Sequence, residues 1–185
     1  MKSVRNFAMV IATSFLFNAV NAQEKTVEAG GAAMYPSKNI VENAINSKDH
    51  TTLVAAVKAA GLVETLQGAG PFTVFAPTDA AFNMLPKGTV ETLLRPENKN
   101  MLAGVLTYHV VAGRIDGNEL VRLIKEGDGR TELKTVAGGK LWASMKGDKV
   151  FLTDEKGGMA AITIKDVFQS NGVIHVIDHV VLPRS

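Results

Sequence analysis

Residues 72 to 82 read Phe72-Thr73-Val74-Phe75-Ala76-Pro77-Thr78-Asp79-Ala80-Ala81-Phe82, an apolar run that ends at a proline and leads into a helix-start signal. The aromatic and β-branched residues before Pro77 predict a short strand. Thr78 or Asp79 is expected to cap the helix that follows, with Phe82 on its inner face. A carboxylate at a helix start meets free backbone N–H groups and the positive end of the helix dipole, so Asp79 needs no catalytic explanation.

Apolar residues recur at helical spacing on both sides of this stretch. The spacing predicts helices over residues 37–45, 51–60, 62–66, 90–94, 97–106 and 118–125, with a short strand over residues 108–111. From residue 130 onward the period changes to two, which predicts hairpins and a last pair of strands, 159–168 and 173–182, around Asn171-Gly172. Helices that dominate the first half and strands that dominate the second predict an α+β fold.

The N-terminus carries the pattern of a cleavable signal peptide. Lys2 and Arg5 precede an apolar core of about 11 residues, too short for a bilayer span of about 20, and small residues end the segment at Ala22. We expect residues 1–22 to be removed, residues 23–36 to form a flexible leader, and residues 37–185 to form one domain. No second apolar segment follows, so the sequence predicts secretion to the periplasm or the exterior without a stable membrane anchor.

Composition excludes several kinds of chemistry. The chain has no cysteine, which excludes disulfides, thiol catalysis and cysteine-based metal sites. Its formal charge of +2 falls to zero when Lys2 and Arg5 leave with the signal peptide, and a neutral domain has no electrostatic footprint for nucleic acid. The absence of an Asn-x-Ser/Thr glycosylation sequon favours a bacterial source.

Three segments resemble the fasciclin domain family. Residues 72–82 resemble its first signature box, residues 106–111 its central Tyr-His segment and residues 171–178 its second box, in the family's order. The resemblance covers residues 37–183 and implies a wedge of β-strands with helices packed against it. It also implies a non-enzymatic role in adhesion, with a protein or polysaccharide partner at a cell surface or in a matrix.

The resemblance points to two candidate partner-binding segments. Tyr108-His109 lies in the region proposed as part of an integrin-binding surface in animal members, and Asp166-Val167 stands where those members carry an Asp-Ile motif. Both segments join a polar tip to an apolar body, which is the mixture that interfaces use. A structural role is the preferred interpretation of each segment, and partner binding is the alternative. In a strand, Tyr108 and His109 would point to opposite faces and could not form one catalytic pair.

Histidine offers another candidate chemistry. His175 and His179 could share a metal ion on a helix, but the sequence around them predicts a strand, along which four residues span about 13 Å. We therefore expect His175 to be a buried, hydrogen-bonded core residue. Trp142 is expected in the core, with an exposed aromatic platform as the alternative. No nucleophile elbow, phosphate loop or dinucleotide fingerprint occurs, so the sequence predicts no catalytic residue, metal or cofactor.

Three functions follow from these observations, in order of preference. The first is an exported adhesion or recognition module; because adhesion needs two contacts and one domain offers one face, homo-oligomerisation is one way to supply the second. The second is a carrier of a small apolar ligand such as a lipid, which would require an apolar pocket with a few polar groups. A hydrolase or metalloenzyme comes third.

Overall fold

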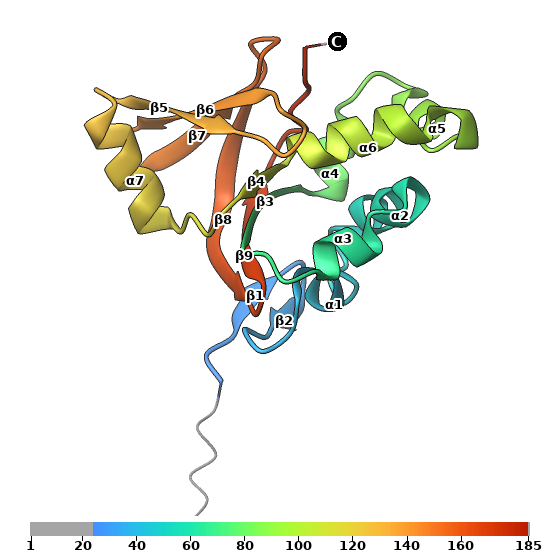
Figure 1. The fold of residues 1–185 in the computed structure, drawn as a ribbon, viewed down its shortest axis with the longest axis horizontal. Helices are drawn as coiled ribbons and strands as arrows, with labels where there is room; N and C mark the ends of the chain where they lie inside the picture. The colour runs from blue at the N-terminus through green and yellow to red at the C-terminus, as the bar shows by residue number, and fades with distance from the viewer. Residues whose placement is uncertain (1–23, 185) are drawn as a thin grey trace, which may run out of the picture.

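The computed structural model describes residues 24–184. Within them, a strongly curved seven-stranded sheet is covered by helices on two sides (Figure 1). The strands are hydrogen-bonded in the order β4-β3-β9-β8-β7-β6-β5. At the two ends of the sheet, Val111 forms an antiparallel bridge with Thr135, so the first and last strands meet. The strand bounds are β3 Phe72–Pro77, β4 Val110–Ala112, β5 Arg130–Lys134, β6 Lys140–Lys146, β7 Lys149–Thr153, β8 Met159–Gln169 and β9 Gly172–Ile177.

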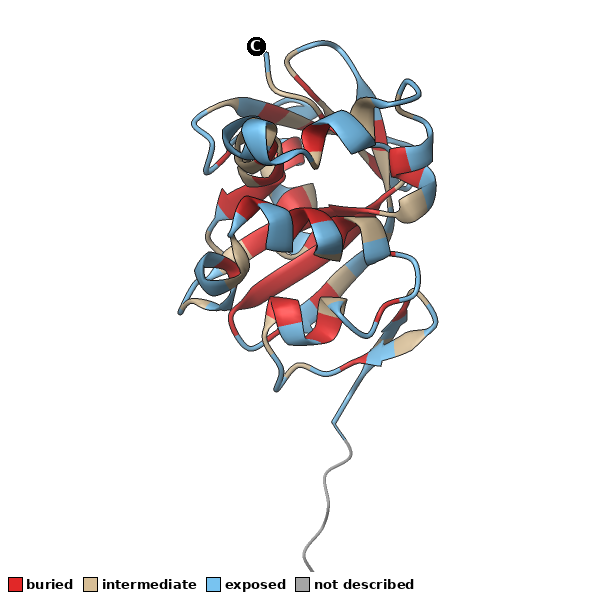
Figure 2. Cartoon of the chain, turned by 90° about the vertical axis from the view of Figure 1, so that its right-hand side faces the viewer, coloured by how far each residue is buried: buried red, intermediate tan, exposed pale blue. Residues whose placement is uncertain are grey.

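The parallel pair β3 and β9 forms the centre of the sheet. Phe72 lies opposite Gly172 and Pro77 opposite Ile177, so the decisive stretch of the first half pairs with a segment near the C-terminus. Both strands are buried on both faces, as the continuous apolar sequence of such strands requires (Figure 2). Side chains on alternate faces enter different cores: Val74 joins one hydrophobic cluster, while Phe75 joins the other.

Helices cover the two faces unequally. The helices α1 to α6 and the 3-10 helix η1 lie on one side of the sheet, and α7 lies on the other (Figure 1). This arrangement confirms the predicted α+β class and the wedge of strands with helices packed against it. The bounds are α1 Ile40–Ala44, α2 Thr51–Ala60, α3 Val63–Gln67, α4 Asp79–Asn83, α5 Thr89–Leu93, η1 Pro96–Asn98, α6 Lys99–Tyr108 and α7 Gly117–Glu126.

The structure of residues 27–34 differs from the prediction for this segment. The sequence predicts a flexible leader over residues 23–36, but β1 (Val27–Ala29) and β2 (Ala32–Met34) form a hairpin there, with Gly30 and Gly31 at positive φ in its turn. Ala29 and Met34 are buried in the same cluster as α1 and α2. These two apolar side chains order the segment, because their burial offsets the conformational entropy that the short hairpin loses. The predicted signal peptide, residues 1–22, lies outside the described residues.

Two boundaries near the candidate sites also differ from the predictions. Residues 108–111 were expected to be a strand, but Tyr108 is the last residue of α6, His109 is its C-cap and β4 begins at Val110. The last strand was expected to reach residue 182, but β9 ends at Ile177. Apolar residues continue to Leu182, so the pattern of the sequence could not show where the strand ends.

Asn171 links the second box to the helical layer. The turn between β8 and β9 is formed by Ser170 and Asn171, because Gln169 already pairs with Gly172. The buried Asn171 amide accepts a hydrogen bond from the Ile40 backbone N–H (3.0 Å) and donates to the carbonyl oxygens of Leu66 (2.8 Å) and Gly68 (2.9 Å). One side chain therefore holds the starts of α1 and β9 and the end of α3 together.

Candidate functional site

Tyr108 is fully buried in the structure. Its ring lies in the cluster between the sheet and α7, and none of it is exposed. The hydroxyl donates to the Lys140 carbonyl oxygen (2.5 Å) and accepts from the Glu155 backbone N–H (3.1 Å). Burial raises the pKa of Tyr108 to about 12. The side chain thus ties the end of α6 to the strands and presents nothing to a partner.

His109 is buried beside it, with both ring nitrogens used. Nδ1 lies 2.8 Å from the Val105 carbonyl oxygen, and Nε2 accepts a hydrogen bond from the Val181 backbone N–H (3.2 Å). This pattern requires the proton to be on Nδ1. Burial lowers the pKa of His109 to about 4, so the ring is neutral at physiological pH. Tyr108-His109 therefore offers no exposed side chain to a partner, because the pair lies at a helix end in the core and not in the predicted strand.

Asp166 and Val167 are also occupied within the fold. Asp166 lies in an irregular part of β8, where the pairing with β9 shifts, and has φ 62, a left-handed conformation. Its Oδ1 accepts a hydrogen bond from the backbone N–H of Gly117 at the start of α7 (2.6 Å). Val167 is only 1% exposed. The Asp166-Val167 segment therefore presents no apolar side chain to a partner. The Asp166 carboxylate holds the start of α7 against the sheet.

His175 is a core residue, as predicted. It is fully buried and stacks on Phe75 with ring centroids 5.8 Å apart. Nδ1 accepts from the Asp166 backbone N–H (3.3 Å), and Nε2 lies 2.9 Å from the Ile115 carbonyl oxygen. Burial lowers the pKa of His175. Among residues 24–184, no group of three or more acidic or histidine side chains is placed to hold a metal ion.

Asp79 has a structural role, but its carboxylate binds the start of α2 and not that of α4. Thr78, not Asp79, caps α4, with its hydroxyl accepting from the Ala81 N–H (3.2 Å). The Asp79 carboxylate instead accepts bonds at the start of α2, from the Thr51 hydroxyl (2.7 Å) and the Thr52 N–H (2.8 Å). Burial alone would raise the pKa of Asp79, but these hydrogen bonds outweigh it and hold the pKa below its usual value.

Trp142 lies on β6 and is half-buried. The Arg130 guanidinium covers its ring, with the central carbon 4.7 Å from the ring centroid. The Trp142 ring is therefore neither a core residue nor a free aromatic platform, the two environments predicted for it. It is partly exposed, and a cation stacks on one of its faces.

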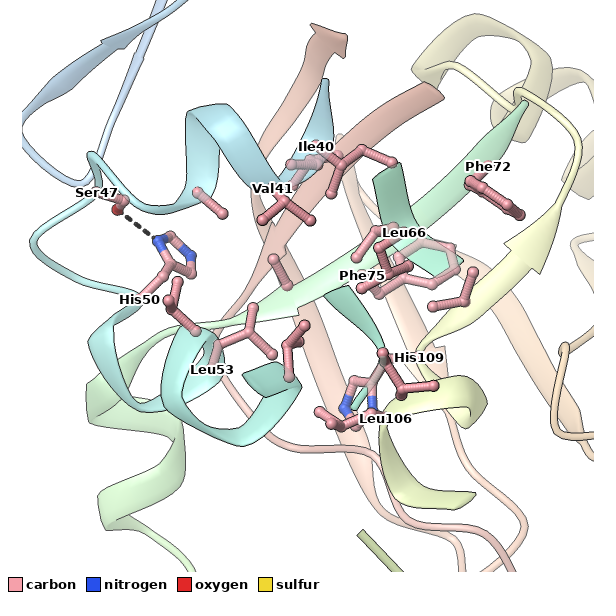
Figure 3. Close-up of a pocket in the computed structure, with 18 of the residues that line it drawn as sticks. Ile40, Val41, Ser47, His50, Leu53, Leu66, Phe72, Phe75, Leu106 and His109 are labelled. Carbon is pink, nitrogen blue, oxygen red and sulfur yellow. Dashed lines mark hydrogen bonds between the residues drawn. The ribbon is translucent and has the colours of Figure 1, made fainter. Parts of the chain in front are cut away.

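An apolar cavity of about 80 Å³ lies between the helical layer and the central strands (Figure 3). Its walls come from ten elements, among them α1, α2, α3, β3 and α6, which lie far apart in the sequence, and include Ile40, Val41, Leu53, Leu66, Phe72 and Leu106. Ser47 and His50 lie on one wall. A second cleft of about 410 Å³ lies between α7 and the strands β7 and β8 and is lined by charged and apolar residues alike.

His50 is the residue that the sequence analysis missed. It precedes α2, is 5% exposed, and its Nδ1 lies 2.7 Å from the Ser47 hydroxyl. Its Nε2 has no hydrogen-bond partner; among residues 24–184 it is the one buried side-chain polar atom in that state. Burial lowers the pKa of His50 against the attraction of Asp49 and Asp79. Nothing in the local sequence distinguishes this histidine, because the cavity around it is built by long-range contacts.

Comparisons with known proteins agree on one family. The family model described as "Fasciclin domain" matches residues 48–183. Protein sll1483 of Synechocystis sp. is 48% identical over 160 residues, covering 86% of this chain and 82% of its own. Uncharacterized protein sll1735 of the same organism is 44% identical over 147 residues, covering 78% of this chain and 97% of its own.

A solved structure shares the fold. It is described as "Novel Fold Revealed by the Structure of a FAS1 Domain Pair from the Insect Cell Adhesion Molecule Fasciclin I" and superposes with a TM-score of 0.71 at 16% identity. The match covers 84% of this chain and 57% of that chain, which contains two such domains. At this identity the likeness concerns the fold alone. Within residues 24–184, no helix is long and apolar enough to cross a membrane.

Proposed function

The chain belongs to the fasciclin domain family, and from this membership we propose that it is an exported, non-enzymatic adhesion or recognition module that binds a protein or polysaccharide. The observation that carries the proposal is the match of the fasciclin domain model to residues 48–183, a domain that also occurs in the insect cell adhesion molecule Fasciclin I. The partner is located at a cell surface or in a matrix, and the protein reaches it through the periplasm or the exterior.

The binding surface lies outside the signature boxes. Tyr108, His109 and Val167 are buried, so a partner must contact other residues. Exposed apolar side chains are the best candidates, because methionine and aromatic residues are enriched in interfaces. The large apolar residues with the greatest exposure are Ile45 (53%), Met84 (55%), Met101 (60%) and Val136 (48%).

A binding assay on labelled mature protein tests this proposal. Retention on cells and matrix of the source organism is compared for wild type, single serine substitutions at these four positions, and Lys146→Ala as a control. Surface substitutions change stability by less than about 0.5 kcal/mol, so thermal melts should be unchanged. Loss of retention in one of the serine variants with an unchanged melt supports the proposal. Wild type that is retained no better than an unrelated neutral domain contradicts it.

A second function, carriage of a small apolar ligand, is favoured by the cavity between the helical layer and the sheet. Ligand sites are concave, mostly apolar and supplied with a few polar groups, and this cavity has that character. Native mass spectrometry of the protein purified from its own host tests it, with a copurifying small molecule as the expected result. The same spectra report whether the protein forms a homo-oligomer.

A further inference from the structure

The Nε2 atom of His50 is buried and has no hydrogen-bond partner. An unpaired polar atom in a buried site destabilises the fold relative to a hydrogen-bonded one. The side chain is 5% exposed, its Nδ1 is held by the Ser47 hydroxyl, and its opposite ring edge faces the apolar side chains of the cavity (Figure 3). The ring is therefore held at Nδ1 by Ser47, and His50 lines the cavity with its Nε2 lacking a hydrogen bond of good geometry.

The other polar groups in the wall do not share this condition. The Thr107 hydroxyl donates to the Ala103 carbonyl oxygen (2.7 Å), and both ring nitrogens of His109 are bonded. Lys58 and Thr65 are exposed. A buried water needs 2–4 polar partners, and His50 offers one, so a water molecule here would be poorly held.

A ligand that brings its own apolar body satisfies the same atom better. We propose that the cavity binds a small neutral aliphatic alcohol, with its hydrocarbon chain against the apolar wall and its hydroxyl hydrogen-bonded to His50 Nε2. This inference rests on the carrier function and is independent of the adhesion role.

The chemistry of the wall selects a neutral hydroxyl over a charged group. Burial disfavours the protonated form of His50, and Lys58 in the wall is exposed, so no buried cation balances a carboxylate inside the cavity, where an uncompensated charge is costly. The Ser47 hydroxyl can donate to Nδ1 or accept from it, which leaves Nε2 as a donor or as an acceptor. A hydroxyl group can pair with either form.

The size of the cavity limits the chain. An engineered cavity of about 150 Å³ holds benzene, and this one has about 80 Å³, so by the same ratio it accommodates about three heavy atoms, as in ethanol. Across the linear alcohols, affinity should rise about fourfold per added methylene and stop rising once the cavity is full.

The test uses ethanol and, as its matched analogue without a hydroxyl, chloroethane. Binding of both is measured by NMR titration of the mature wild type, His50→Leu and Ser47→Ala, with the His50 ring nitrogens observed directly in the wild type and Ser47→Ala. We expect ethanol to shift the Nε2 resonance and chloroethane to leave it in place. His50→Leu should lower the ratio of ethanol to chloroethane affinity at least tenfold, and Ser47→Ala should lower it by less.

If His50→Leu alters the shape of the cavity, the affinities for both ligands change together. The ratio of the alcohol affinity to the chloroalkane affinity therefore still reports the hydrogen bond to His50. An unchanged ratio in His50→Leu, with an Nε2 resonance that ethanol does not move in the wild type, overturns the role of His50 while leaving the carrier function standing. Failure of both compounds to bind the wild type at concentrations that leave it folded overturns the ligand site and the carrier function together. Neither result bears on adhesion, which the retention assay tests separately.

Discussion

Acidification should destabilise this domain before its carboxylates titrate, chiefly through His109. The ring is 2% exposed, and burial lowers its pKa from the usual 6.5 to about 4, against the hydrogen bond to Val105 and the attraction of Asp154. In the unfolded chain the same ring is hydrated and takes up a proton near pH 6.5. Between these two pKa values, the unfolded state therefore binds a proton that the folded state does not.

The sign and size of the effect follow from this difference. The stabilisation is fully present above pH 6.5, falls as the pH drops, and is lost once the pH passes below about 4. The two pKa values correspond to about 3 kcal/mol in total, of which about 2 kcal/mol is lost by pH 5. His50 and His175 have pKa values lowered by burial as well, so they add losses of the same sign.

Urea unfolding at pH 7, 6 and 5 measures the loss. His109→Gln removes the titration while keeping an amide that can donate to the Val105 carbonyl oxygen, and His179→Gln at an exposed position is the control. Wild type and His179→Gln should lose about 2 kcal/mol more than His109→Gln between pH 7 and pH 5. If the three proteins lose stability in parallel over this range, the burial argument for His109 is refuted.

Two further substitutions and the cleavage of the signal peptide give testable predictions. Asp166→Ala should lower the free energy of unfolding, measured in urea, by about 1–3 kcal/mol, because it removes the hydrogen bond to the Gly117 N–H and places alanine in a left-handed conformation. Asp166→Asn should lower it by less, and equal losses of stability in the two variants would contradict this account. Asn171→Ala should cost about 3 kcal/mol through three lost buried hydrogen bonds, and a loss below about 1 kcal/mol would show that water replaces them. Exported protein should begin at Gln23, and an intact mass equal to that of the full chain would rule out cleavage of the signal peptide.

Local chemistry explains why so much of the fold was visible in the sequence. The period of apolar residues distinguished helices from strands, since side-chain direction repeats every 3.6 residues in one and every two in the other. Thr78 before α4 and the glycine after α2 are signals read within one turn of helix. The burial of His175 was predictable because apolar residues surround it on both faces of the strand.

Tertiary structure alone decided which polar side chains are exposed, and with that the nature of the candidate site. His109 is buried because its ring meets the backbone of Val181, 72 residues away, and Asn171 holds Ile40 across 131 residues. The hairpin at residues 27–34 is ordered by apolar contacts that no local pattern announces. The cavity at His50 arises in the same way, because ten elements of the chain, from β1 to β9, contribute residues to its walls. Periodicity reports which residues share a face, but only the packing of distant elements decides what that face meets.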